Sequence, residues 1–371
     1  GISEDERITL TTAMKDLVAG TMETVLSGAT DAEIAADWRA RTAPRVDEIR
    51  ERMAAKRAET VIEDPQVSED WCTGLEKRRI KAGEILGAPQ SDGDFVDVVF
   101  CYDANFETAI YPTVRSLVSN TQSAVRLTLL TREISQDAAT RLSATFPDTE
   151  FVWIDVTDLK FEGLSLLRHT TVSTMDRLFL PQLLDYTSRA VYLDVDMVIL
   201  DDIADLYNWD LDGNSLGARV TIFRGWNSGF GLAAFIERQL SPEQISVFRR
   251  EYLYGKPLDF KCFNAGMQVM DLERLRAERF TDRMLGIVQR YGVNDQFAVN
   301  LFAAGKVAHI DPAWNHFATQ ESLPDPKLVH YTGYIKPWEK EYCPKAELWR
   351  DYIRPVDGLE PLSAFDKLWF K

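Results

Sequence analysis

Short apolar segments alternate with amphipathic segments of about a dozen residues between positions 95 and 155. Residues 95–100, 124–130 and 150–155 have the pattern of buried strands, and residues 108–119 and 135–146 between them have that of helices. This alternation predicts βαβ units and a mostly parallel sheet. Such sheets bind ligands at the carboxyl ends of their strands. We therefore expect an α/β fold whose functional residues follow its strands.

Two aspartates, Asp194 and Asp196, interrupt the apolar stretch 191–200. Carboxylates are costly to bury without a partner, and hard oxygen ligands suit Mg²⁺ or Mn²⁺. Their side chains point the same way only if the strand stays extended through both residues. We expect a divalent metal site at the end of this strand, of the kind that anchors a diphosphate.

Composition limits the classes of function. The 371 residues are 45% hydrophobic and 27% charged, which predicts a globular chain with a substantial core. The net charge of −16 argues against nucleic-acid binding. Four cysteines without a CxxC pair, and no signal-peptide core in the first residues, predict a reduced, cytoplasmic protein. No run approaches the ~20 apolar residues of a membrane span, although C-terminal aromatic residues leave peripheral membrane contact open.

The first 93 residues differ from the rest, being rich in Ala, Glu and Arg. We expect two to four helices here, over residues 11–26, 31–38 and 46–53, with Pro44 starting a new helix. The turn-rich segment 88–94 then leads into a second domain, 94–371. The extension either packs on the main domain or docks a partner, and its residues leave both possibilities open.

Polar residues follow other predicted strands. Asp103 and Asn105 come after the first strand, where an Asx-turn is the structural alternative to ligand binding. Asn264 precedes small residues that let a backbone approach a ligand. Asp295 and Gln296 open a helical stretch, in which Asp295 also fits an N-cap. A GxGxxG motif is missing after the first strand, which disfavours a dinucleotide-binding fold.

One late segment combines an imidazole, a glycine and an ammonium group. His330 ends an apolar run, and Gly333 and Lys336 follow it. A neutral imidazole would complete a metal site with two carboxylates, and Lys336 would neutralise a phosphate as a point charge. This segment therefore predicts a second part of the same metal and phosphate site.

Six short motifs occur in a characteristic order. They are Asp103-x-Asn105-Phe106, Arg177-Leu178, Tyr192-Leu-Asp-Val-Asp196, Phe263-Asn-Ala-Gly266, Asp295-Gln296 and His330-Tyr-x-Gly-x-x-Lys-Pro-Trp338. With this order and spacing, the chain from about residue 95 to about residue 352 resembles the family 8 glycosyltransferases, which have the GT-A fold. That family includes bacterial lipopolysaccharide galactosyl- and glucosyltransferases and, more distantly, glycogenin.

The resemblance implies transfer of a hexose, with retention, from UDP-glucose or UDP-galactose to a hydroxyl of an unidentified glycan, protein or other acceptor. It implies Mn²⁺ or Mg²⁺ held by Asp194, Asp196 and His330. The other implied roles are uridine binding by Asp103, Asn105 and Phe106, diphosphate binding by Gly333 and Lys336, donor binding by Asn264 and Ala265, and catalytic roles for Arg177, Asp295 and Gln296.

The chain also departs from that family's pattern. Met175 and Asp176 precede Arg177, where relatives have Tyr-Ala, and we expect the extra carboxylate to lie near the sugar. His169 lies where some relatives have a histidine near the acceptor. Two alternatives are weighed against a transferase. A haloacid-dehalogenase-like phosphatase would use Asp194 as its nucleophile, but on its first strand. A catalytically weak UDP-sugar-binding protein would keep the site and dock a partner.

Overall fold

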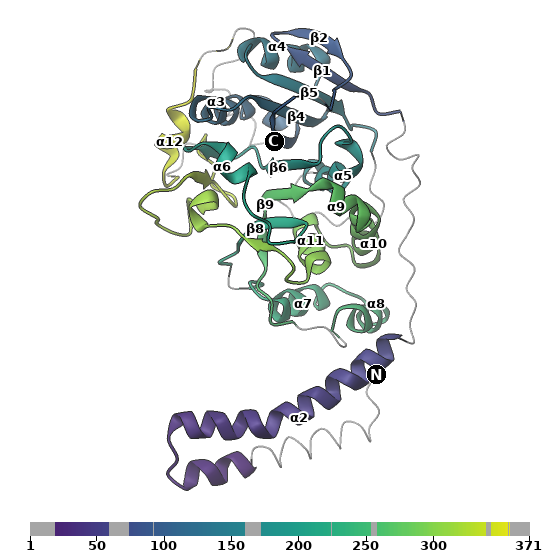
Figure 1. Ribbon diagram of the computed structural model, residues 1–371, viewed down its shortest axis with the longest axis vertical. Coiled ribbons are helices and arrows are strands. Elements are labelled where there is room, and N and C mark those ends of the chain that lie inside the picture. The colour runs from purple at the N-terminus through teal and green to yellow at the C-terminus, as the bar shows by residue number, and fades with distance from the viewer. Residues whose placement is uncertain are drawn as a thin grey trace. The chain divides into compact units, whose positions relative to one another are not determined.

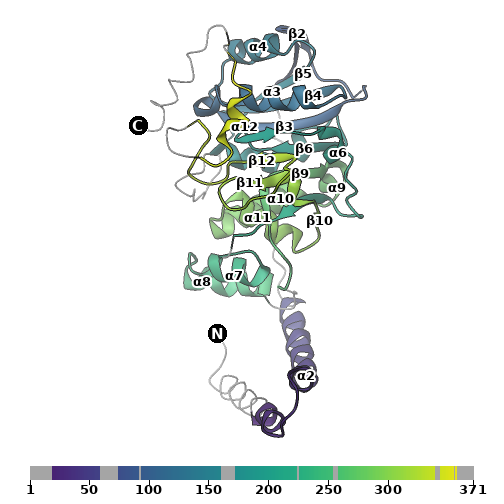
Figure 2. The ribbon, with the colours of Figure 1, turned by 90° about the vertical axis from the view of Figure 1, so that its left-hand side faces the viewer.

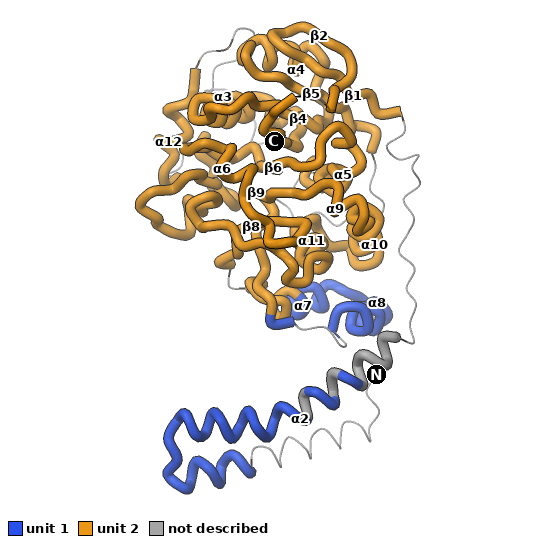
Figure 3. The backbone as a smooth tube through the Cα atoms, viewed as in Figure 1, with its two compact units in different colours: residues 1–63, 233–259 blue, residues 64–232, 260–371 orange. Residues whose placement is uncertain are grey.

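The computed structural model describes residues 19–58, 74–91, 93–159, 172–223, 225–253, 258–338, 343–354 and 356. The chain divides into two compact units, which Figure 3 shows in different colours. Unit 1 comprises residues 1–63 and 233–259, and unit 2 comprises residues 64–232 and 260–371. The predicted domain boundary at residue 93 stays a prediction. Unit 2 contains all the predicted site residues.

A nine-stranded sheet forms the centre of unit 2. Its strands, in the order in which Figures 1 and 2 show them, are β10 (Ala308–His309), β8 (Leu216–Val220), β9 (Phe263–Asp271), β6 (Arg189–Leu193), β3 (Val96–Asp103), β4 (Val125–Arg132), β5 (Glu150–Asp155), β1 (Lys77–Lys81) and β2 (Glu84–Gly87). Among these described strands, β9 and β1 alone run against the common direction. The predicted mostly parallel sheet is confirmed.

A smaller sheet continues from the end of β6. It consists of β7 (Met197–Ile199), β12 (Leu328–His330) and β11 (His316–Phe317), with β12 in the middle. Strand β12 is antiparallel to β7, so that His330 lies opposite Met197. This pairing brings His330, from late in the chain, next to the segment that joins β6 to β7.

Helices of unit 2 cover the large sheet and complete its core. Besides the helical residues 19–26, the helices of the described residues in the two units are α2 (Asp31–Ala58), α3 (Ile110–Asn120), α4 (Gln136–Thr145), α5 (Leu180–Leu183), α6 (Ile203–Tyr207), α7 (Gly229–Glu237), α8 (Pro242–Phe248), α9 (Leu272–Ala277), α10 (Phe280–Tyr291), α11 (Asp295–Ala303) and α12 (Ala346–Arg350). Ser135 caps α4 by accepting a hydrogen bond from the Ala138 N–H. Side chains of α3, α4 and α6 share one buried cluster with Val98, Phe100 and Leu127 of the sheet. Burial of these apolar faces holds the strand ends in place.

The first 93 residues are only partly helical. Residues 19–26 are helical, while 11–18 lie outside the described residues. Helix α2 runs through Pro44 without ending, so the prediction of a new helix after Pro44 is wrong. Residues 77–87 form β1 and β2 instead of helix. Strand β1 contains one apolar residue, Ile80, which is fully buried where β1 pairs with β5. No local sequence pattern predicts that pairing.

Packing on the main domain and docking of a partner both stay open for the N-terminal helices; Met22, Val25, Leu26 and Trp38 are exposed on them. No helix within the described ranges is long and apolar enough to cross a membrane. Of the C-terminal aromatic residues, Trp349 is fully buried against Trp338, and residues 365–370 lie outside the described part of the chain.

Candidate active site

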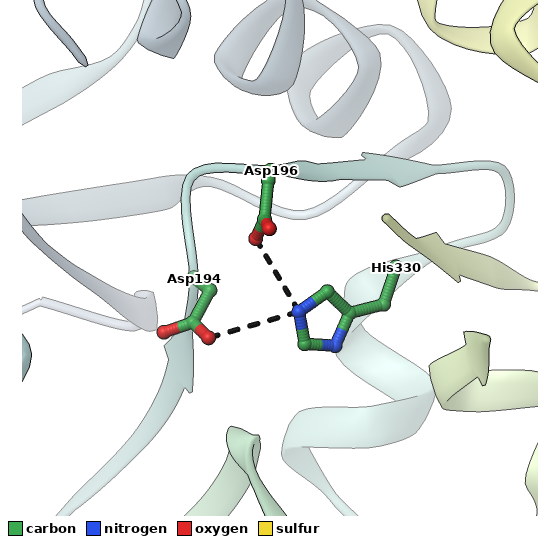
Figure 4. Close-up of side chains that lie close together, drawn as sticks. All are labelled: Asp194, Asp196 and His330. Carbon is green, nitrogen blue, oxygen red and sulfur yellow. Dashed lines mark ion pairs between the residues drawn. The ribbon is translucent and has the colours of Figure 1, made fainter. Parts of the chain in front are cut away.

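A bend between β6 and β7 carries the two aspartates (Figure 4). Because β6 ends at Leu193, the condition of an extended strand through both residues is not met. The backbone at the bend is held from both sides: the Asp194 N–H donates to Gly266 O (2.8 Å), and the Asp196 carbonyl accepts from the Tyr331 N–H (3.0 Å). The carboxylates therefore converge through the bend and not through strand periodicity.

Asp194, Asp196 and His330 form the group predicted to hold a metal. One ligand atom from each lies within 4.8 Å of the others. His330 Nε2 is 3.3 Å from Asp196 Oδ1 and 3.7 Å from Asp194 Oδ2 (Figure 4). Two carboxylate oxygens and an imidazole nitrogen suit a divalent ion such as Mn²⁺. Gly266 keeps the space open, because a Cβ there would lie 2.5 Å from Asp194 Oδ2 and 2.4 Å from His330 Cε1. The donor set thus fits the implied ion.

The other carboxylate oxygens are hydrogen-bonded. Asp194 Oδ1 accepts from the Tyr192 hydroxyl (2.6 Å) and from Arg177 Nη2 (3.0 Å). Asp196 Oδ2 accepts from Lys336 Nζ, which also donates to Tyr331 O (2.8 Å). Burial by itself would raise the pKa of Asp196, but the ammonium group of Lys336 holds that pKa below its ordinary value. Asp196 is therefore ionised at neutral pH.

The two predicted diphosphate residues lie on either side of a short turn. Gly333 is exposed and has φ of +87°, a left-handed conformation that favours glycine. Lys336 is buried, and its ammonium group contacts Asp196. The phosphate role of both residues stays a prediction, with Lys336 placed directly beside the metal group.

Arg177 connects Asp194 to Asp295. Its Nε lies 3.2 Å from Asp295 Oδ2, and its guanidinium stacks 4.2 Å above the centre of the Tyr192 ring. Burial would lower the pKa of Arg177, but Tyr192, Asp295 and Asp194 raise it above the ordinary value. The N-cap of α11 is Asn294, whose side chain accepts from the Phe297 N–H, so the N-cap interpretation of Asp295 is wrong. Arg177 thus lies between the carboxylates of Asp194 and Asp295 and pairs with both.

The extra carboxylate of Asp176 pairs with an arginine. Asp176 is fully buried and accepts two hydrogen bonds from Arg132, at 2.6 and 2.8 Å. The expected position of this carboxylate near the sugar stays a prediction; in the structure a buried arginine at the end of β4 pairs with it. His169 lies outside the described residues.

Amide groups from β9 and α11 form the neighbouring part of the site. Gln296 Oε1 accepts from Asn264 Nδ2 (3.1 Å) and from the Ala265 N–H (3.0 Å). The Ala265 carbonyl accepts from Arg177 and from Gln268 Nε2 (2.9 Å). The three residues Asn264, Ala265 and Gln296 are thus brought together beside the metal group, as their motifs predict.

Asn315, in the 3₁₀ helix Pro312–Asn315, is a site residue that the sequence does not reveal. It hydrogen-bonds both His330 and Asn264, and no motif surrounds it. The only signal would have been its position just before the short strand that pairs with β12.

The first motif lies at the end of β3. Asp103 Oδ1 accepts from the Asn105 N–H (3.0 Å), so the Asx-turn is present. Asn105 is exposed, and Phe106 packs edge-on against Trp338 with 6.2 Å between ring centres. The first and last motifs therefore meet in space, while uridine binding by Asp103, Asn105 and Phe106 stays a prediction.

Comparison with known proteins gives a consistent result. The family model described as "Glycosyl transferase family 8" matches residues 97–342. Lipopolysaccharide 1,2-glucosyltransferase of Escherichia coli (strain K12) is 24% identical over 293 residues, 73% of this chain and 81% of that protein. Probable galacturonosyltransferase-like 7 of Arabidopsis thaliana is 28% identical over 215 residues, 49% of this chain and 56% of that protein.

Solved structures are similar in fold. The galactosyltransferase LgtC in complex with donor and acceptor sugar analogs has a TM-score of 0.56 at 23% identity, covering 69% of this chain and 95% of LgtC. The bifunctional glycosyltransferase WbbM has a TM-score of 0.58 at 19% identity, covering 76% of this chain and 52% of WbbM. These likenesses show the predicted GT-A fold. Because the family match spans well over half of the 371 residues, the chain belongs to glycosyl transferase family 8.

Proposed function

We propose that this protein is a metal-dependent, retaining glycosyltransferase that moves glucose or galactose from a UDP-sugar to a hydroxyl of a glycan or other acceptor. The convergence of Asp194 Oδ2, Asp196 Oδ1 and His330 Nε2 carries the proposal. Family membership supports a transferase. The names of the glucosyltransferase and galactosyltransferase relatives motivate the choice of hexose.

The donor would lie across the carboxyl ends of the strands. When bound, Mn²⁺ or Mg²⁺ would supply positive charge against the UDP diphosphate as negative charge develops there. Lys336, already beside Asp196, would add a second cation, and Gly333 would let the backbone approach. Asp103, Asn105 and Phe106 would then receive the uridine at the end of β3.

The proposed reaction breaks the bond from the sugar C1 to the β-phosphate oxygen and forms a bond from C1 to the acceptor oxygen. The acceptor proton passes to the departing phosphate oxygen, so no strong protein base is required. The sugar carbon becomes oxocarbenium-like on the way.

Gln296 would stabilise the bound donor and not attack its C1. Its Oε1 already accepts two hydrogen bonds, and the orientation is unambiguous because the Ala265 N–H can only donate. A carbonyl oxygen committed in this way is a poor nucleophile, which leaves the amide N–H group for the donor. Arg177 would act by holding Asp194, and Asp295 by holding Arg177.

The test is a screen of UDP release from each UDP-sugar with Mn²⁺, applied to the parent chain and to Asp196→Ala. We expect the variant to lose at least about 100-fold in rate and to bind UDP more weakly in Mn²⁺. Asp201→Ala is the matched control, because Asp201 is a carboxylate near β7 that pairs with Lys327 (2.7 Å) away from the metal group.

Parent-like UDP release by Asp196→Ala would show the metal assignment to be wrong. Tight UDP binding by the parent without turnover would favour the UDP-sugar-binding alternative. Release of phosphate from simple phosphomonoesters would favour the phosphatase, which the family match disfavours.

A further inference from the structure

Asn315 is a fully buried amide that lies between the metal group and the sugar-side amides. Its Oδ1 is 2.9 Å from His330 Nδ1, and its Nδ2 is 3.1 Å from Asn264 Oδ1. Its backbone carbonyl accepts a hydrogen bond from Arg219, which is itself paired with Glu321. Both the side chain and the main chain of Asn315 are therefore held in place.

The direction of these hydrogen bonds follows from a backbone group that can only donate. The Gly266 N–H donates to Asn264 Oδ1 (3.0 Å), which identifies that atom as the oxygen. The atom of Asn315 that faces this oxygen must then be a donor, Nδ2. Its other atom, Oδ1, accepts from His330, so the proton of the neutral imidazole lies on Nδ1.

This tautomer leaves the lone pair of His330 on Nε2. Nε2 is the atom that lies 3.3 Å from Asp196 Oδ1 and 3.7 Å from Asp194 Oδ2. A histidine binds a metal only through an unprotonated nitrogen, and the partner of its other nitrogen sets the tautomer and the ring orientation. In this structure the partner of His330 Nδ1 is Asn315.

The same chain of amides continues to the sugar side. Asn264 Nδ2 donates to Gln296 Oε1 (3.1 Å), and the Ala265 N–H donates to the same oxygen (3.0 Å). The donor-to-acceptor direction of these hydrogen bonds is thus fixed by two independent backbone N–H groups, those of Gly266 and Ala265. One continuous run of hydrogen bonds joins the proposed metal ligand His330 to the proposed sugar-binding amide Gln296.

We propose that Asn315 is a positioning residue that sets the tautomer and ring orientation of His330 and couples them to Asn264. The proposal rests on the proposed metal role of His330. It does not rest on the identity of the donor sugar or on turnover.

The test compares Asn315→Leu, which removes both hydrogen bonds, with Asn315→Asp, which keeps an acceptor for His330 and loses the donor to Asn264. The first readout is the pair of ¹⁵N shifts of His330 in the metal-free protein, which report the tautomer. The chain has four histidines, so a His330→Gln variant assigns the signal. The second readout is Mn²⁺ affinity without nucleotide, measured by electron paramagnetic resonance.

For Asn315→Leu, we expect loss of the pure Nδ1–H tautomer and a 10–100-fold loss in Mn²⁺ affinity, the usual effect of removing a partner of a metal-bound histidine. For Asn315→Asp, we expect the tautomer to be kept and Mn²⁺ affinity to stay within about threefold of the parent value, because a carboxylate also accepts from Nδ1. UDP-sugar hydrolysis by Asn315→Asp should fall, because the coupling to Asn264 is broken.

Asn300→Leu is the matched control. Asn300 is a buried amide that hydrogen-bonds the backbone of Phe263 at 2.9 and 3.0 Å, on the same strand as Asn264. Its loss should lower stability without changing the His330 tautomer or Mn²⁺ affinity.

An unchanged tautomer and unchanged Mn²⁺ affinity in Asn315→Leu would overturn the proposal. Equal losses of the tautomer and of Mn²⁺ affinity in Asn315→Leu and Asn315→Asp would also overturn it. Should Asn315→Leu fail to fold, loss of the Nδ1–H tautomer in Asn315→Asp overturns the proposal by itself. If parent and variants show the expected tautomers and affinities but the parent releases no UDP from any UDP-sugar, the proposed function fails and the positioning role stands.

Discussion

Gly266→Ala tests the metal site with the smallest possible change. Gly266 lies in β9 and does not have a positive φ, so alanine is compatible with its backbone. The added methyl would lie 2.4 Å from His330 Cε1, 2.5 Å from Asp194 Oδ2 and 3.1 Å from Asn264 Oδ1. The perturbation is therefore steric, and it acts on two of the three proposed metal ligands at once.

The size of the effect follows from these distances. Ordinary van der Waals contact begins at 3.4 Å, so the His330 ring and the Asp194 carboxylate must each retreat by about 1 Å. Metal–ligand distances tolerate about 0.2 Å. A shift several times larger removes ligands from the ion, and we expect Mn²⁺ affinity to fall by about 100-fold, which corresponds to ~2.8 kcal/mol.

The assay is a Mn²⁺ titration followed by electron paramagnetic resonance, together with urea unfolding. Overpacking alone should cost about 1–3 kcal/mol of stability. Gly217→Ala is the matched control, because its methyl would lie 2.7 Å from Leu211 Cδ2 and 3.2 Å from Ile310 Cδ1, on the neighbouring strand β8. It should lose stability but keep Mn²⁺ affinity. Parent-like Mn²⁺ affinity in a folded Gly266→Ala would refute the reasoning.

Asp97 on β3 and Arg126 on β4 are buried and joined by hydrogen bonds of 2.7 and 3.0 Å. Asp97→Ala leaves the arginine without this partner and should lower the free energy of unfolding, measured in urea, by about 3–5 kcal/mol. A loss below about 1 kcal/mol would contradict this prediction. Burial lowers the pKa of His316 below its ordinary 6.5, so the unfolded chain takes up a proton first as the pH falls. Stability should therefore decline below pH 6.5, and His316→Leu should remove that part of the slope between pH 5 and 7; identical slopes would show the reasoning to be wrong. A chain starting at residue 74 should keep UDP-sugar hydrolysis and its Tm, whereas one starting at residue 91 loses β1 and β2, uncovers the edge of β5 and should melt lower. Equal melting temperatures would exclude a role for these strands.

Local patterns predicted the part of the fold that rests on strong periodicity. Strand β5 occupies the predicted residues 150–155, and β3, β4, α3 and α4 lie within three residues of their predicted bounds. These elements have continuous apolar runs or a clear cap, so neighbouring residues already carry the information. Strand β1 lacks such a run, and its pairing with β5 could not be predicted.

The candidate site likewise has features that the sequence predicts and features that it does not. Residue types and order along the chain were enough to predict the group formed by Asp194, Asp196 and His330, because carboxylates and an imidazole within apolar runs need a partner. The pairing of Asp176 with Arg132, 44 positions away, was not predictable from neighbours. The same holds for the link from Asn315, at the end of a 3₁₀ helix, to His330 in β12.

The amino-acid sequence alone predicted the fold class, the family resemblance and the identity of the candidate metal ligands, because each depends on residue types and on short motifs. Only the tertiary structure decided that the aspartates meet through a bend, that the Lys336 ammonium group contacts Asp196, and that a buried amide hydrogen-bonds His330. Side-chain directions and hydrogen-bond partners in the candidate site are set by the packing of strands that lie far apart in the sequence, and no local sequence pattern predicts that packing.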